Sequence, residues 1–168
     1  REYDPDKAKF HLKEAGLDSL AIKINASEAA FAGAVDAAIL IQNSAKGAGI
    51  ELEVERTPND GFWADHWIKS PFITSYWSGR PVEDQMFSTA YQAGVSWNET
   101  RQSNERFDEL LVAARAEHNE DTRRAMYNEM QEIVHNEGGA LIPMFASYVF
   151  AIGDNVRMPE QTATNWDM

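Results

Sequence analysis

The spacing of hydrophobic and polar residues changes period several times along the chain, and each change marks an expected element. Apolar residues at every second position predict strands over residues 19–26 and 50–55. In the second of these, glutamates take the alternate positions and are expected to face water. An apolar run over residues 72–77, followed by Ser-Gly-Arg-Pro, predicts a third strand that stops at a turn.

Helical spacing precedes and separates these strands. Asp4 is a good N-cap and Pro5 suits the first helical position, so a helix is expected to run from there to a stop at Gly16. The same spacing predicts helices over residues 29–47, from Asn59 or Asp60 to Lys69, and over residues 83–92.

Two long helices are expected in the second half of the chain. The first has an apolar stripe that is expected to be buried, formed by Phe107, Leu110, Leu111 and Ala114. The second has the same spacing at Met126, Met130, Ile133 and Val134. Asn119 is expected to cap the second helix, and Gly138-Gly139 to end it.

The segment from Leu141 to Ile152 is mostly apolar and predicts one or two further strands, with Pro143 at a strand start or edge. Helices and strands then alternate, which predicts an α/β fold in which helices flank a mostly parallel sheet. We expect one lobe over residues 1–153. A polar tail over residues 154–168 is expected to lead to the rest of a longer parent protein.

Composition and charge narrow the classes of partner. The 168 residues include 27 acidic and 15 basic side chains, for a formal net charge of −12. This charge repels phosphate backbones and anionic lipid surfaces, so neither nucleic acid nor a membrane surface is expected as a partner. The absence of cysteine excludes disulfides and thiolate chemistry. No run of 18 apolar residues occurs, so no span of a membrane is expected in this segment.

The residue types that carry catalysis are present, but their spacing points to no reaction. None of the four histidines forms HExxH or lies at helical spacing from another, so no metal site is expected. Glycine-rich phosphate loops and the nucleophile elbow are also absent from the sequence. We therefore expect no catalytic residue, no metal and no cofactor, and a protein that is not an enzyme.

Aromatic residues are dense before the turn at residue 79. Trp63 and Trp67 share a helix face at i, i+4 and are expected to pack onto the sheet. Tyr76 and Trp77 lie at the carboxyl end of the expected third strand, the end at which open α/β sheets bind ligands. Because neighbouring strand residues point to opposite faces, one of these two is available to a cleft.

Arg80 follows directly after this turn. Its guanidinium is always charged and pairs well with carboxylates, so it is a candidate for contact with an anionic group. The plainer interpretation is an exposed arginine that is paired with Glu83 or Asp84.

Four stretches carry a family resemblance in their order along the chain. They are YDPDKAK from Tyr3, GIELEV from Gly49, NERFDELL from Asn104, and RRAMY from Arg123 followed by ALIPMF from Ala140. The sequence resembles the carboxyl-terminal lobe of the dipeptide/oligopeptide-type (family 5) extracellular solute-binding proteins of ABC importers. Together the four stretches span nearly the whole chain.

The resemblance implies a periplasmic-binding-protein-like α/β lobe, which is a fragment of a larger two-lobe protein. Such a protein would be periplasmic, or lipid-anchored outside the cell. It would capture a peptide or similar small organic solute between its lobes and deliver it to an ABC permease in the inner membrane.

The resemblance also implies where the ligand would bind. Family members often carry an aspartate three residues after the tryptophan, which meets the amino group of a peptide; here Arg80 stands at that position. A guanidinium favours a carboxylate or other anion there, unless Asp84, one helical turn on, takes the acidic role. The expected ligand-binding residues are Tyr76, Trp77, Ser78, Arg80, Asp84 and Trp97.

Two other function classes stay open at this point. An α/β enzyme could use carboxylates such as Asp60, Asp65 or Asp84, with one strongly perturbed acid in a pocket. A protein-interaction domain could instead use the aromatic surface to hold a partner.

Overall fold

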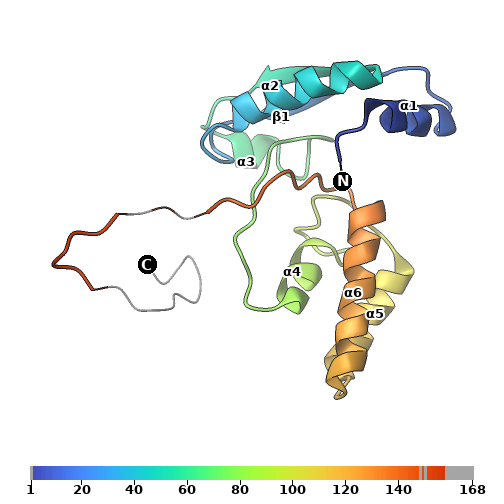
Figure 1. Ribbon diagram of the computed structural model, residues 1–168, viewed down its shortest axis with the longest axis vertical. Helices are drawn as coiled ribbons and strands as arrows, with labels where there is room; N and C mark the ends of the chain where they lie inside the picture. Colours follow the sequence, from blue (N-terminus) through green and yellow to red (C-terminus); the bar gives the residue numbers. More distant parts are fainter. Residues whose placement is uncertain (1, 148, 150, 158–168) are drawn as a thin grey trace. The chain divides into compact units, whose positions relative to one another are not determined.

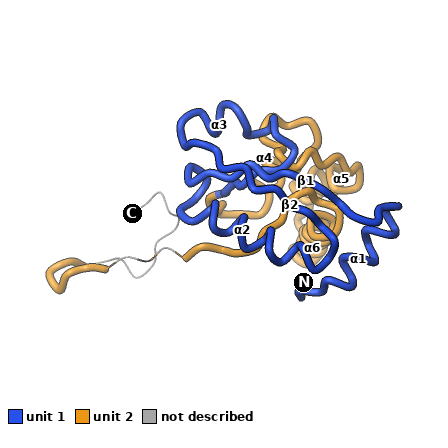
Figure 2. The backbone as a smooth tube through the Cα atoms, turned by 90° about the horizontal axis from the view of Figure 1, so that it is seen from above, with its two compact units in different colours: residues 1–77 blue, residues 78–168 orange. Residues whose placement is uncertain are grey.

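The computed structural model describes residues 2–147, 149 and 151–157, and it divides the chain into two compact units (Figures 1 and 2). Unit 1 comprises residues 1–77 and holds the sheet, and unit 2 begins at Ser78 and holds a group of helices. The domain boundary expected after residue 153 stays a prediction.

Unit 1 is built on two parallel strands, β1 (Leu20–Ala26) and β2 (Ile50–Arg56). Both were expected from the alternating pattern, and their parallel pairing confirms the expected sheet type. The register runs from Leu20 opposite Ile50 to Ala26 opposite Arg56. On β2 the glutamates are exposed while Leu52 is buried, as the alternation requires.

The third strand expected over residues 72–77 is wrong except for one point of pairing. The Asn25 N–H donates to Phe72 O at 3.0 Å, and the Thr74 N–H donates to Asn25 O at 3.0 Å, which forms a single parallel bridge. The carboxyl end of β1 therefore lies between β2 and residues 72–74. This explains why Ile24, Asn25 and Ala26 are all buried, whatever face they occupy.

The first two helices of unit 1 differ in how they start. In α1 (Pro5–Glu14) the Asp4 carboxylate accepts the Lys7 N–H at 2.9 Å, as expected for an N-cap. The helix α2 (Ala34–Ala45) starts later than residue 29, because Glu28 reaches forward and accepts the N–H groups of Gly33 and Val35. The intervening residues form turns, and a 3-10 helix η1 (Lys46–Ala48) leads into β2.

The aromatic helix α3 (Phe62–Asp65) is much shorter than the expected span to Lys69. Its N-cap is Gly61, at φ 75°, rather than Asn59 or Asp60. Ile68 has a φ of 62°, a left-handed conformation that no α-helix contains, so the residues after Asp65 form turns. The core of unit 1 lies between these helices and the sheet and includes Ile24, Ala26, Ala30, Ala34, Ala38, Leu52 and Phe62.

Unit 2 contains α4 (Glu83–Ala90), α5 (Glu105–Ala116) and α6 (Glu120–Glu137). The stripe expected on α5 is confirmed, because all four of its residues are buried. On α6 only Met130 is fully buried, and the rest of its expected stripe is half-buried. Asn104 and Asn119 cap the two helices with their side-chain oxygens.

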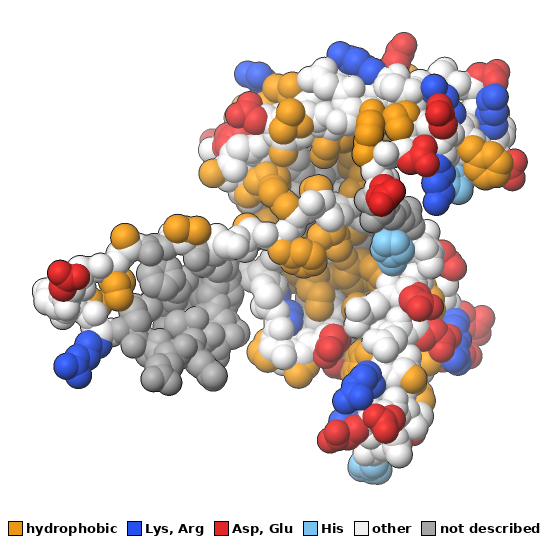
Figure 3. All heavy atoms as spheres, in the orientation of Figure 1, with side chains coloured by type: hydrophobic (Ala, Val, Ile, Leu, Met, Phe, Trp, Pro, Cys, Tyr) orange, Lys and Arg blue, Asp and Glu red, His pale blue; other side chains and the backbone are white. Residues whose placement is uncertain are grey.

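The strands expected between Leu141 and Ile152 are wrong for the described part of that segment, residues 141–147, 149 and 151–152, which contains none. Phe145 and Val149 are 90% and 91% exposed. This segment supplies some of the exposed hydrophobic side chains drawn orange in Figure 3. A strand needs main-chain partners, and no described residue provides them here. Tyr148 and Phe150 lie outside the described residues.

Candidate functional site

In unit 1, hydrogen bonds of polar side chains join the segment after the carboxyl end of β1 to two other segments of the chain. The Ser27 N–H donates to Thr74 Oγ1 at 3.3 Å, and Ser27 Oγ donates to Asn59 Oδ1 at 2.9 Å. Ser27 Oγ also accepts the Ala29 N–H at 3.2 Å. Ser27 is fully buried, so this network fixes three separate segments against one another at the edge where parallel strands end.

An aromatic cluster lies on the same unit. Trp63 packs edge-to-face against Phe62 at 5.1 Å, against Trp67 at 6.3 Å and against Tyr76 at 5.7 Å between ring centroids. Phe62 is buried with Ala30 and Ala34, and Trp63 packs on that group. The shared helix face expected for Trp63 and Trp67 is wrong, because α3 ends at Asp65; Trp63 packs on the Phe62 group rather than on the sheet, and the cluster forms an apolar support.

Tyr76 and Trp77 differ in exposure. Tyr76 is 57% exposed although its ring contacts Trp63, whereas Trp77 is half-buried. Tyr76 therefore presents a supported aromatic face to solvent.

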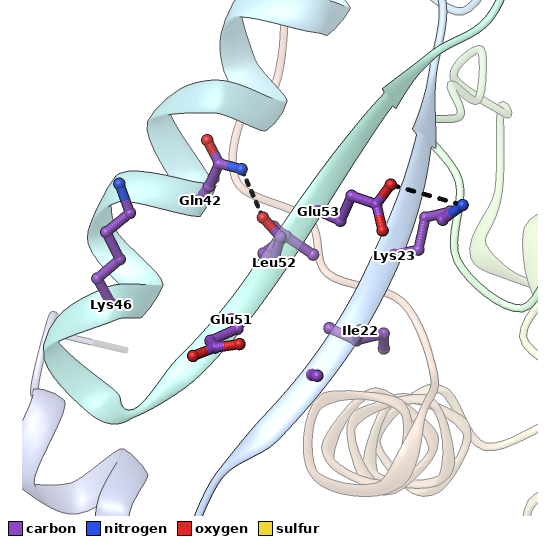
Figure 4. A pocket seen from close by; sticks show the side chains of 8 residues that line it. Ile22, Lys23, Gln42, Lys46, Glu51, Leu52 and Glu53 are labelled. Atoms are coloured by element: carbon purple, nitrogen blue, oxygen red, sulfur yellow. Dashed lines mark hydrogen bonds and ion pairs between the residues drawn. The ribbon is translucent and has the colours of Figure 1, made fainter.

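A separate groove of about 500 Å³ lies beside β2, and none of the expected site residues lines it. Figure 4 shows Gln42 reaching from α2 to donate to Leu52 O, and Lys23 lying against Glu53. Lys23 Nζ lies 3.6 Å from the Glu53 carboxylate and 3.3 Å from that of Glu55, and the hydrogen bond to Glu55 raises the lysine pKa most. Lys23 is thus paired with Glu53 inside the groove, while Lys46 donates to Asn43 Oδ1 of α2 at 3.0 Å.

The remaining expected site residues belong to unit 2. Arg80 lines a hollow of about 310 Å³ with Pro81, Val82, Glu83 and Met86. Its guanidinium Nη1 donates to Ser78 O at 3.0 Å and to Gly79 O at 3.2 Å. The turn thus folds around the arginine, and Ser78 contributes through its main chain.

Asp84 is paired within unit 2. Arg115 Nε and Nη2 donate to its two oxygens at 2.7 and 3.1 Å, and the Tyr127 hydroxyl donates to Oδ1 at 3.3 Å. Burial, and then the Asp84 charge, raises the pKa of Tyr127, and the hydrogen bond to Asp84 raises that of Arg115. A ligand ammonium group would have to compete with Arg115 for this carboxylate.

Trp97 stands in the turn between α4 and α5 and is 48% exposed. Next to it, Asn98 is 8% exposed and makes several hydrogen bonds. Sequence reasoning assigned no site role to Asn98, Arg115 or Tyr127. Arg115 and Tyr127 meet Asp84 from 31 and 43 residues away, a distance that no local pattern encodes.

The structure brings Tyr76 together with Trp63, and Arg80 with the main chain of Ser78. Tyr76 and Trp77 belong to unit 1, and Ser78, Arg80, Asp84 and Trp97 to unit 2. Within the described ranges, no three histidine, aspartate or glutamate side chains gather as a metal ion would require. No helix among the described residues combines the length and apolar character needed to cross a bilayer.

Comparison with solved structures identifies the fold. A periplasmic/solute-binding protein (PBP/SBP), MoaA from A. tumefaciens R10 in complex with mannopinic acid, matches 78% of this chain with a TM-score of 0.67 and 22% identity. The periplasmic binding protein DppA from Helicobacter pylori, in complex with the peptide STSA, matches 80% with a TM-score of 0.64 and 24% identity. A peptide-binding protein of a peptide ABC transporter matches 80% at 26% identity, with a TM-score of 0.64.

These matches cover only part of the known proteins. The chain spans 28% of the MoaA chain, 27% of the DppA chain and 63% of the third. No family model matches the sequence, and no curated protein matches it either. The chain therefore has the fold of part of a lobe of ABC-importer solute-binding proteins, which confirms the expected α/β, periplasmic-binding-protein-like fold. The structural neighbours are binding proteins rather than enzymes.

Proposed function

We propose that this chain forms part of the solute-binding component of an ABC importer, which captures a peptide or similar small organic solute between two lobes. The observation that carries this proposal is the fold match to solute-binding proteins over 78–80% of the chain. An exposed, supported aromatic ring at the carboxyl end of the parallel strands, Tyr76, adds a surface suited to a ligand.

The solute class rests on the neighbours and on Arg80. Structures similar to this chain hold mannopinic acid, the peptide STSA, the dipeptide Met-Leu and a nickel–histidine complex. All of these carry carboxylates, and a guanidinium such as that of Arg80 would suit such a group. Asp84, already paired with Arg115, is less suited to receive an amino group. We therefore assign short peptides or related organic acids as the solute.

The partner follows from the same function. A solute-binding component delivers its ligand to a permease, so the proposed partner is an ABC permease in the inner membrane and the proposed location is the periplasm or the outer face of the cell. No cofactor is needed, because capture and release involve no bond making. No grouping of the described residues favours the enzyme alternative over this one.

The test is solute binding by the 168-residue chain and by two variants. Isothermal titration with a panel of dipeptides and tripeptides should give weak binding, because one lobe supplies only part of the wall. Tyr76→Ala should weaken it at least fivefold, whereas Phe10→Ala should not change it. Phe10 is a matched control, because it is an aromatic residue that is also 57% exposed. Absence of binding to every peptide, or equal loss in both variants, would contradict the proposal.

A further inference from the structure

The turn between α4 and α5 is ordered around one buried side chain, Asn98. Its amide Nδ2 donates to Gln92 O at 3.1 Å and to Gln102 O at 2.8 Å, with a longer contact to Tyr91 O at 3.5 Å. Its Oδ1 accepts from Thr100 Oγ1 at 2.8 Å and from the Gln102 N–H at 3.2 Å. Both arms of the turn are therefore joined through a single amide group.

The backbone of the turn agrees with this interpretation. The Asn98 N–H donates to Val95 O at 3.2 Å, and the Arg101 N–H donates to Asn98 O at 3.2 Å. Arg101 has a φ of 55°, a conformation that a non-glycine residue keeps only where its surroundings determine it. Ala93 is anchored as well, because its N–H donates to Asp108 Oδ1 on α5.

Trp97 is held at the exposed side of this ordered turn. It directly precedes Asn98, and its carbonyl accepts the Glu99 N–H at 2.9 Å. A large aromatic ring that is 48% exposed on a rigid turn is typical of a binding residue, because little side-chain and loop entropy is lost when a ligand covers it.

We propose that Asn98 is a positioning residue which holds Trp97 as a ligand-contacting ring, against a flat or apolar part of the bound solute. This inference rests on the proposed function, since it assigns to solute binding a further contact residue, with its support, within unit 2. Asn98 itself touches no solute, because its side-chain amide is already hydrogen-bonded within the turn.

The experiment labels the full chain with 5-fluorotryptophan and follows it by fluorine NMR. The chain has five tryptophans, and Trp97→Phe identifies the resonance of Trp97. Asn98→Ala should move that resonance at least halfway to the value of free 5-fluorotryptophan and leave the others in place. Asn25→Ala is the matched control, since Asn25 is a buried asparagine, 7% exposed, in the other unit; it should leave the Trp97 resonance unchanged.

A second readout tests the ligand contact with the dipeptide Met-Leu as probe. Addition of Met-Leu should shift the Trp97 resonance of the native chain. Trp97→Ala and Asn98→Ala should each weaken binding at least threefold, and the double variant no further than either alone. Should Asn98→Ala fail to fold, Thr100→Val, which removes one hydrogen bond to Asn98, should give a smaller shift and a smaller loss in the same direction.

The outcomes separate this inference from the proposed function. Binding of Met-Leu that shifts other resonances but not that of Trp97 would overturn the inference and leave the proposed function standing. An unmoved Trp97 resonance in Asn98→Ala would overturn the positioning role. Lack of binding by Met-Leu and by the whole peptide panel would remove the proposed function, and the ligand role of Trp97 with it.

Discussion

Each compact unit presents an exposed aromatic ring, Tyr76 in unit 1 and Trp97 in unit 2, and the two rings are supported by different kinds of contact. In unit 1 the Tyr76 ring packs against Trp63, which packs in turn against the buried Phe62. In unit 2 the turn that carries Trp97 is held by hydrogen bonds that converge on Asn98. One support is apolar packing, and the other is a buried polar network.

The difference predicts different tolerance to change. Packing energy is spread over many weak contacts, so a conservative swap in the aromatic cluster costs little while a large deletion costs much. In a polar network each removed partner leaves a buried group without its hydrogen bond, so even an isosteric substitution lowers the stability.

The strongest way to break the apolar support is Phe62→Ala. Phe62 is 1% exposed, so its removal should leave a cavity and lower the free energy of unfolding by about 3–5 kcal/mol. Urea denaturation of the full chain, followed by tryptophan fluorescence, measures this loss. Phe62→Leu should cost less than half as much, because it keeps most of the volume.

Phe10→Ala serves as the control for this measurement. Phe10 lies on α1 and is 57% exposed, so its truncation should change stability by less than about 0.5 kcal/mol. Similar losses for Phe62→Ala and Phe10→Ala would show that the aromatic cluster is not a packed support.

The polar support is tested by Thr100→Val, which keeps the shape of the side chain. Thr100 Oγ1 donates to Asn98 Oδ1 at 2.8 Å and accepts the Gln102 N–H at 3.2 Å, and valine can do neither. We expect a loss of about 1–2 kcal/mol by urea denaturation. Thr100→Ser, which retains the hydroxyl, should recover most of that loss; equal losses in the two variants would mean that the hydrogen bonds contribute nothing.

The local sequence pattern was enough to predict the helices, whose hydrogen bonds join residues close in sequence, and the two strands that pair with each other. The stripe of Phe107, Leu110, Leu111 and Ala114 repeats at helical spacing, and all four residues are buried on α5. Asp4 and Asn119 cap their helices as expected, because a cap acts on residues three positions away. The alternation in β1 and β2 was also sufficient, since each has a partner in the other.

The sequence pattern gave wrong strands where, among the described residues, the apolar run has at most one bridge to a neighbouring main chain. The apolar runs at residues 72–77 and 141–152 have strand composition, but a strand forms only where another main chain accepts it, and composition does not reveal that partner. The candidate site shows the same limit. Asp84 was predicted as a ligand acid or a partner of Arg80, and its pairing with Arg115 and Tyr127 depends on helix packing that no spacing encodes.

The ion pair between Asp84 and Arg115 in unit 2 is expected to contribute less than the buried hydrogen bonds around Asn98. The Asp84–Arg115 pair is partly exposed, with 46% of the arginine side chain accessible, so solvent screens it. A double-mutant cycle with Asp84→Asn and Arg115→Met should give a coupling of about 0.5 kcal/mol, which 1 M salt should largely abolish. Arg124→Met, in a more exposed pair, is the control and should change stability by less. A coupling unaffected by salt would contradict the screening argument.

The smallest effect is expected from an ion pair between α5 and α6 that is exposed on both sides. The Arg106 guanidinium donates two hydrogen bonds to the Glu129 carboxylate, at 2.7 and 2.9 Å, and these hold the pKa of Glu129 below its usual value. A lowered folded-state pKa stabilises the fold above that usual value, and the contribution is lost as the pH falls through the folded-state pKa. Carbon-detected NMR titration should therefore place the Glu129 midpoint below that of an unpaired glutamate, and Arg106→Met should raise it toward that value. If the midpoint does not move in Arg106→Met, the pair is not formed in solution. Because linkage ties the pKa shift to stability, Arg106→Met should also lower the free energy of unfolding at pH 7, but by less than Thr100→Val does, since the pair is exposed whereas the contacts around Asn98 are buried.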